Sequence, residues 1–227
     1  MKVLFVGEGP HDIGRDENAA FPPSAANGVV PILARKVVPA IAQDSLAIKW
    51  REITLLDPHK KGLDNKVAAA ILISARRFGC AGTICVRDQD RAGDLAESLA
   101  AGIQKGLRQA GGGHKATFGL AVESVEAWSL GAPSALAAVL GIPNAQMETL
   151  YRVRDVEKYH EKSGKEEHKP KKILEQIAAI QNRHSGTEFR QEVANATDIA
   201  ELEKNCPAGF LPFAARLRET FVESLQS

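Results

Sequence analysis

The sequence predicts an α/β protein with a mostly parallel central sheet and a C-terminal helical extension. Apolar stretches of strand length alternate with stretches of helical periodicity through the first 130 residues. Such alternation is typical of parallel strands joined by helices. After Gly131 no strand pattern remains, and helical pieces are joined by proline-containing and charged links. We therefore expect an α/β core over residues 1–130 and a helical region over residues 131–227.

The composition is ordinary for a globular protein and favours a soluble, cytoplasmic one. Hydrophobic residues make up 44% of the chain, charged residues 25%, and the net charge is +1. The first apolar run, Val3 to Val6, is too short for a signal sequence or a membrane span, so we expect no membrane association. The three cysteines form no C-x-x-C pair, which argues against a disulfide framework and against a zinc ribbon.

The first expected elements are a strand, a long loop, a helix and a second strand. Residues 2–6 form a mostly apolar strand. Residues 7–28 are rich in glycine, proline, asparagine and aspartate, as loops are. Apolar spacing predicts a helix over residues 29–42, in which two prolines shorten or kink the helix. Residues 46–56 alternate in the manner of a strand.

The second half of the core repeats the alternation. Asp64 can cap a helix over residues 65–78, and residues 82–86 form a buried strand. Leucine and isoleucine then recur every four residues, which indicates a helix. In chain order, the remaining expected elements are this helix at 95–107, a strand at 116–122 and a short helix at 123–130.

Acidic residues follow two of the expected strands. Asp88 and Asp90 lie two residues apart after the strand at 82–86, so they start on the same side of it. Glu8 follows the first strand in the turn GEGPHD. Carboxyl ends of strands in open α/β sheets face the ligand crevice, and clustered carboxylates favour a hard cation such as Mg²⁺. The alternative is a loop of solvated aspartates in which Asp90 caps a helix.

Other familiar sites find little support in the sequence. Gly7 and Gly9 form a G-x-G, but the third glycine and the long helix of the dinucleotide fingerprint are missing. No H-E-x-x-H occurs, so zinc chemistry is unsupported. The sequence shows no obvious histidine–acid pair that would complete a catalytic triad with Ser124 or Ser129, which argues against a serine hydrolase.

Two motifs carry a resemblance to the Toprim domain, which is shared by bacterial primases, topoisomerases and OLD-type nucleases. VGEGPHD, from Val6 to Asp12, is similar to the hydrophobic-x-E-G-x-x-D signature of that domain. RDQDRAGDLA, from Arg87 to Ala96, resembles its D-x-D motif. The resemblance covers about residues 1–130 and implies a Toprim-like Rossmannoid fold.

The resemblance also implies roles for individual acids. Glu8 would be the acid–base group or a metal contact, and Asp88 and Asp90 would be metal ligands that act in catalysis with Glu8. Asp12 would be a supporting acid, and Asp94, just beyond the motif, is a further supporting candidate. The chain departs from replicative primases and topoisomerases in lacking their zinc and tyrosine domains. It also has a long loop after residue 14, and position 87 holds an arginine where the family usually has an apolar residue.

A third stretch adds two acids at another strand end. AVESVEAWSL, residues 121–130, places Glu123 and Glu126 three apart, on one face of a helix. With HKPKKIL, residues 168–174, it resembles Toprim-like proteins of bacterial mobile and defence loci. In OLD-type nucleases an extra acid near here helps to bind a second metal, which implies this role for Glu126, with Glu123 in support. The alternative is a helix start that favours acids through its dipole, with Trp128 in the core.

Lysines of the helical region are candidates for nucleic-acid binding. Residues 159–172 form the most polar segment, which we expect to be an exposed loop. Lys169, Lys171 and Lys172 at its end could contact phosphates. The alternative is a solvated charged face.

The sequence therefore predicts a Toprim-type nuclease that hydrolyses phosphodiester bonds of DNA or RNA with Mg²⁺ or Mn²⁺. The resemblance implies a role in bacterial phage or plasmid defence, beside an ATPase partner since this chain has no P-loop. The helical region could cover one face of the core or mediate assembly, including a homodimer. Two alternatives stay open, namely a nucleotidyl-transfer or small-phosphoester enzyme and a catalytically inactive binding or regulatory module.

Overall fold

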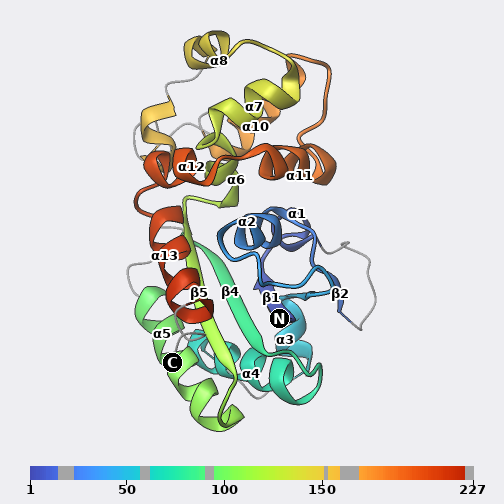
Figure 1. Cartoon of the computed structure of the whole chain (residues 1–227), viewed down its shortest axis with the longest axis vertical. Helices are drawn as coiled ribbons and strands as arrows, with labels where there is room; N and C mark the ends of the chain where they lie inside the picture. Colours follow the sequence, from blue (N-terminus) through green and yellow to red (C-terminus); the bar gives the residue numbers. More distant parts are fainter. Residues whose placement is uncertain (15–22, 57–61, 90–94, 151–152, 159–168, 223–227) are drawn as a thin grey trace.

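The described residues form a five-stranded sheet with helices on both faces (Figure 1). The computed structural model describes residues 1–14, 23–56, 62–89, 95–150, 153–158 and 169–222. The strand order is β2-β3-β1-β4-β5, with parallel pairing except between β2 and β3. The predicted α/β class with a mostly parallel sheet is confirmed. The strands are β1 (Val3–Gly7), β2 (Ser24–Ala25), β3 (Leu46–Lys49), β4 (Gly82–Gln89) and β5 (Lys115–Val122).

Helices connect the strands and make up the described part of the chain beyond β5. This confirms the predicted helical C-terminal region. No described helix has the length and apolarity that crossing a membrane requires. The helices are α1 (Pro10–Ile13), α2 (Val29–Val37), α3 (Trp50–Leu56), α4 (Leu63–Arg76), α5 (Leu95–Ala110), α6 (Val125–Leu130), α7 (Pro133–Leu140), α8 (Asn144–Leu150), the 3₁₀ helix η1 (Val153–Lys158), α10 (Pro170–Ala179), α11 (Thr187–Ala196), α12 (Ile199–Asn205) and α13 (Phe210–Phe221).

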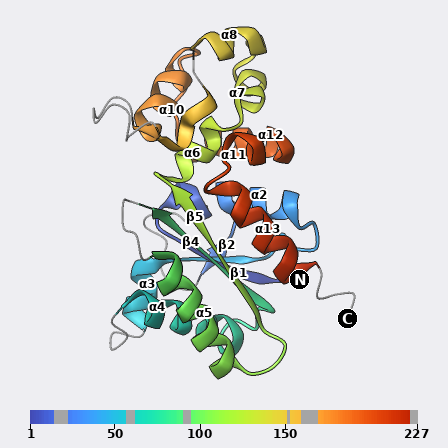
Figure 2. The same ribbon diagram turned by 90° about the vertical axis from the view of Figure 1, so that its left-hand side faces the viewer.

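The central strand β1 contributes to a separate hydrophobic cluster on each face of the sheet. Its side chains alternate between the faces because a strand has a two-residue repeat. Val3 and Phe5 are fully buried in a cluster that includes α2, α13 and the other C-terminal helices. Leu4 and Val6 are fully buried in the second cluster, with α3, α4 and α5. Figure 2 shows the two helical layers on opposite sides of the strands.

The last helix, α13, returns from the helical region to lie along β5 (Figure 1). Gly119 of β5 permits this approach, because a Cβ there would lie only 2.8 Å from Cδ2 of Phe213. Trp128 of α6 is fully buried and stacks on Phe213, with the ring centroids 5.4 Å apart. Phe210 meets the same indole edge-on at 5.3 Å. The expectation that Trp128 lies in the core is confirmed.

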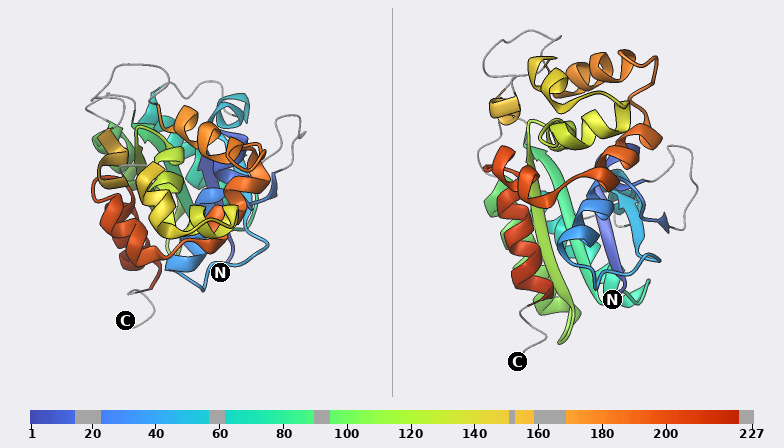
Figure 3. Two further views of the ribbon diagram at one scale, coloured as in Figure 1. Left: turned by 90° about the horizontal axis from the view of Figure 1, so that it is seen from above. Right: turned by 45° about the horizontal axis from the view of Figure 1, so that its top comes forward.

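The remaining helices of the C-terminal region gather beyond one end of the sheet. Figure 3 shows α7, α8 and α10 at the far end, with α11 and α12 between them and the strands. This is the end at which β1, β4 and β5 finish, since α1 and α6, which follow β1 and β5, both lie there (Figure 1). The helical region therefore faces the carboxyl edge of the sheet.

Some expected boundaries are wrong, including the end of the strand at 82–86, which as β4 continues to Gln89 and contains Asp88. The strand expected over residues 46–56 ends at Lys49, and α3 begins at Trp50. Trp50 and Ile53 are both buried, and their three-residue spacing belongs to a helix. The next helix, α4, begins after Gly62, whose φ of 87° suits glycine, so Asp64 lies in the first turn instead of capping it. The helix predicted over residues 29–42 is shortened at its second proline, as expected: it stops at Val37, just before the residue that precedes Pro39.

Candidate active site

Parallel pairing places acids from separate strands at the same edge of the sheet. Val6 of β1 is in register with Cys85 of β4, and both strands run toward the helical region. Glu8 lies one residue beyond the end of β1. Asp88 is the second-to-last residue of β4, which ends at Gln89. The topology therefore puts both predicted acids at the carboxyl edge of neighbouring strands.

Glu8 forms an ion pair with Arg87. The Nε of Arg87 lies 2.9 Å from Oε1 of Glu8, and the two side chains are about one third exposed. The guanidinium also lies 5.8 Å from the centre of the Trp50 ring, within the range of a cation–π contact. Arg87 of the chain itself thus supplies the positive charge beside Glu8. Position 87 is also where the sequence departs from the Toprim motif.

Asp88 connects the end of β4 to the start of α6. Its side chain is half-buried, and Oδ1 accepts a hydrogen bond from the backbone N–H of Val125 at 3.2 Å. This bond orients the carboxylate toward the turn that follows β5. The predicted partner Asp90 and the supporting candidate Asp94 lie outside the described residues, so the Asp88–Asp90 pair stays a prediction.

Asp12 is the buried acid of the site. It is 8% exposed, and its Oδ2 accepts a hydrogen bond from the backbone N–H of Gly9 at 2.8 Å. Burial raises the pKa of Asp12 to about 6, against the lowering effect of the Gly9 bond. The negative charges of Glu126 and Glu8 raise this pKa further, and the positive charge of Arg190 lowers it. A carboxyl group with such a pKa exchanges its proton near neutral pH, as a general acid or base must.

Glu126 forms a buried ion pair with Arg190 of α11. The Nη1 of Arg190 lies 2.6 Å from Oε1 of Glu126, and the side chains are only 4% and 13% exposed. Burial raises the pKa of Glu126, but the charge and hydrogen bond of Arg190 outweigh burial and hold the pKa below its usual value. The Nε of Arg190 donates to the carbonyl of Ser185 at 2.7 Å, which fixes the guanidinium from a second side.

Glu123 does not lie on a helical face with Glu126, as expected from their spacing. It precedes α6 with a φ of 64°, in the left-handed region that non-glycine residues seldom adopt. Ser124 then occupies the N-cap, and the helix begins at Val125. The expectation is wrong because the chain turns sharply between β5 and α6, and this turn places the two acids in different backbone geometries.

The three candidate lysines occupy different positions around α10. Pro170 begins this helix, so the expected exposed loop ends at Lys169, its N-cap residue; residues 159–168 lie outside the described part of the chain. Lys172 forms an ion pair with Glu175 on the same helix, with 2.7 Å between Nζ and Oε2. Lys171 lines a cavity at the edge of the site. Of the three, Lys171 is thus the one that shares this cavity with Arg190, the partner of Glu126.

A divalent cation fits the donor chemistry of this edge. Carboxylate oxygens are the ligands that Mg²⁺ and Mn²⁺ prefer, and Glu8 and Asp88 provide them from neighbouring strands. Across residues 1–14, 23–56, 62–89, 95–150, 153–158 and 169–222, no group of three or more His, Cys, Asp or Glu side chains is placed to hold one ion. Any third ligand from Asp90 lies outside these ranges.

Sequence reasoning missed the partners contributed by α11. Arg190 binds Glu126, and Thr187 Oγ1 lies 2.6 Å from Nδ1 of His11. These partners are 64 and 176 residues apart in the chain, so no local spacing indicates them. Arg87 did carry a signal, because it is a charged residue that directly follows the buried run Gly82–Val86 of β4.

Comparisons of the chain with protein-family models, with curated proteins and with solved structures found no match. The resemblance to Toprim domains therefore stays a prediction that rests on the motifs around Glu8 and Asp88.

Proposed function

We propose that this protein hydrolyses phosphodiester bonds of nucleic acid with the help of Mg²⁺ or Mn²⁺ bound at the carboxyl edge of the sheet. One observation carries the proposal: four acids from separate parts of the chain, Glu8, Asp12, Asp88 and Glu126, gather at that edge. The negative charges of Glu126 and Glu8 both raise the pKa of Asp12, so both acids act on Asp12 electrostatically. Open α/β sheets bind their ligands at this edge.

The acids have different chemical roles in this proposal. Glu8 and Asp88 would hold the cation, which when bound supplies positive charge for the phosphate oxygens. Asp12, whose pKa is about 6, is suited to take a proton from water as the water oxygen bonds to phosphorus. The ester P–O bond then breaks, and the leaving oxygen takes up a proton. Glu126 holds Arg190 in place through their buried ion pair.

The biological setting is proposed on narrower grounds. A role in phage or plasmid defence, with an ATPase partner, rests on the resemblance to Toprim-like proteins of defence loci. A homodimer through the helical region is a further proposal. Neither affects the chemistry of the site.

Cleavage assays test the proposed function directly. Plasmid DNA and a structured RNA are incubated with the protein in Mg²⁺, in Mn²⁺ and in EDTA. We expect metal-dependent cleavage that Glu8→Gln and Asp88→Asn each reduce at least about a hundredfold, as loss of a group acting in the transition state does. Asp44→Asn is the matched control, because this acid is 73% exposed and pairs only loosely with Lys2 at 4.0 Å. No cleavage, or equal cleavage by all four proteins, would overturn the proposal.

A binding module is the second candidate, and the arginine partners favour it. Glu8 and Glu126 are each neutralised by an arginine of this chain, at 2.9 Å and 2.6 Å. Such a module would bind nucleic acid without cleaving it. The two candidates differ in calorimetry with Mn²⁺, because only the enzyme requires metal binding that Asp88→Asn removes.

A further inference from the structure

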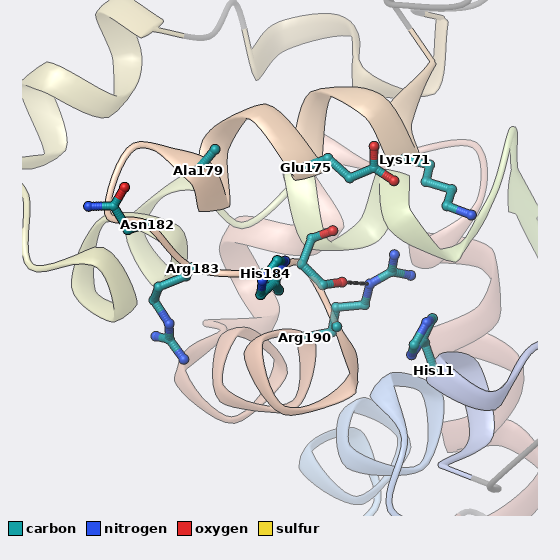
Figure 4. Close-up of a pocket in the computed structure, with 10 residues that line it drawn as sticks. His11, Lys171, Glu175, Ala179, Asn182, Arg183, His184 and Arg190 are labelled. Carbon is teal, nitrogen blue, oxygen red and sulfur yellow. Dashed lines mark hydrogen bonds between the residues drawn. The ribbon is translucent and has the colours of Figure 1, made fainter.

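A cavity of about 660 Å³ lies against the acidic edge of the sheet, between the core and the helical region (Figure 4). Its volume is in the range typical of small-ligand sites. Its walls come from α1, α10, the segment that leads into α11, and α11 itself. The described lining residues are His11, Lys171, Glu175, Ala179, Asn182, Arg183, His184, Ser185, Gly186 and Arg190.

Nitrogen donors from three elements meet at one end of this cavity. In Figure 4 the side chains of Lys171 and Arg190 extend from α10 and α11 toward His11 of α1. The ammonium of Lys171 has neither a hydrogen-bond nor an ion-pair partner among the residues that the structure describes. The one carboxylate of the lining, Glu175, pairs with Lys172. This end of the cavity is therefore suited to a negatively charged group.

The donors at this end are held in position before any ligand binds. Arg190 is 3% exposed, and its guanidinium is fixed by Glu126 at 2.6 Å and by the Ser185 carbonyl at 2.7 Å. His11 is fixed through Thr187 at 2.6 Å. A preorganised guanidinium loses little freedom on binding an anion, which favours affinity. The Arg190–Glu126 contact also joins the cavity wall directly to the acidic cluster.

We propose that this cavity binds a phosphate group of the nucleic-acid strand on which the neighbouring acids act. An ammonium and a guanidinium supply the charge-assisted N–H donors that phosphate oxygens accept, and the imidazole of His11 lies beside them. A phosphate held beside Arg190 places the adjoining part of the strand next to Glu126 and Asp12. The choice of nucleic acid as the source of the phosphate rests on the proposed function, whereas the binding of phosphate at Lys171 does not.

Binding is measured in EDTA, so that cleavage plays no part. The probes are inorganic phosphate, followed by calorimetry, and a fluorescent single-stranded decanucleotide, followed by anisotropy. We expect Lys171→Ala to weaken binding of both probes roughly tenfold, the loss expected for one charge-assisted contact. We also expect it to lower the slope of log Kd against log salt for the oligonucleotide by about 1. Lys171→Arg should restore most of the affinity.

Lys204→Ala is the matched control, because it removes the same charge from an exposed position of α12 that does not line the cavity. The proposal requires this variant to bind both probes as the unmodified protein does. Equal losses for Lys171→Ala and Lys204→Ala would show nonspecific attraction and overturn it, as would the absence of binding. If Lys171→Ala weakened the binding of inorganic phosphate but not that of the oligonucleotide, the assignment of the phosphate to a nucleic-acid strand would be overturned. A Lys171-dependent strand complex that is never cleaved would refute the proposed hydrolysis and leave this site standing.

Discussion

Arg190 binds Glu126 across 64 residues of sequence, with 2.6 Å between Nη1 and Oε1 and both side chains largely buried. A buried charge that loses its partner is costly, because the remaining charge has neither water nor a counter-ion. We expect Arg190→Met to lower the free energy of unfolding by about 3–5 kcal/mol. Urea denaturation followed by circular dichroism measures this change.

The double variant Arg190→Met/Glu126→Gln separates two effects on stability, namely the loss of the ion pair and the buried charge of Glu126 that is left without a partner. It should be clearly more stable than Arg190→Met, since no charge is left buried. Arg183→Met is the comparison at the surface, where Arg183 pairs with Glu192 at 2.7 Å, and its effect should be much smaller. A double variant as unstable as the single one would contradict the explanation.

The buried carboxyl of Asp12 should make stability depend on pH. Its pKa is about 6 in the folded protein, above the ordinary value of 3.8, chiefly because of burial. A raised folded-state pKa means that the folded protein binds the proton more tightly than the unfolded chain does. The resulting stabilisation is complete below about pH 3.8 and is lost as the pH rises through about 6.

Asp12→Asn removes this titration while keeping an oxygen that can accept from the N–H of Gly9. Relative to the unmodified protein, the variant should gain up to about 3 kcal/mol in unfolding free energy between pH 4 and pH 7. Urea denaturation at several pH values measures the difference. A constant difference across this range would show that Asp12 does not titrate in it.

Arg87 should compete with a metal ion for Glu8. The ion pair at 2.9 Å must open if Glu8 is to bind a cation, and it is exposed enough to be worth only about 0–1 kcal/mol. Arg87→Met should therefore tighten Mn²⁺ binding by up to about fivefold, as measured by calorimetry. Arg51→Met, which removes the charge of an exposed arginine on α3, is the control. Weaker Mn²⁺ binding by Arg87→Met would argue that the arginine positions Glu8 for the metal.

Gly102 allows α5 to lie close to α4. A Cβ at this position would be 2.6 Å from both the Asp64 carbonyl oxygen and Cβ of Val67, so the helices would have to separate. We expect Gly102→Ala to cost about 1–3 kcal/mol in urea denaturation, despite the higher helix propensity of alanine. Gly112→Ala is the control, since a Cβ there meets no atom within 4 Å. Equal effects of the two substitutions would show that the helices can adjust.

Regular patterns made most of the core predictable. The apolar runs of β1, β4 and β5 and the four-residue repeat of α5 appear in the structure close to where they were expected. The stretch at 46–56 misled because Leu46, Ile48 and Trp50 alternate as in a strand up to the first residue of α3, where the helical spacing of Trp50 and Ile53 begins. Only the burial of both side chains on one side of α3 settles the choice.

Local sequence predicted the ends of β1 and β4 to within a few residues, and hence that Glu8 and Asp88 lie at one edge of a parallel sheet. It could not determine what neutralises Glu126 at the same edge, because its partner Arg190 comes from a helix far along the chain. The positions of Lys171, His11 and Arg190 around one cavity were likewise decided only when α10 and α11 folded against α1. Strand ends follow from short-range patterns of hydrophobicity, whereas charge pairing in a buried site depends on which distant helices pack together.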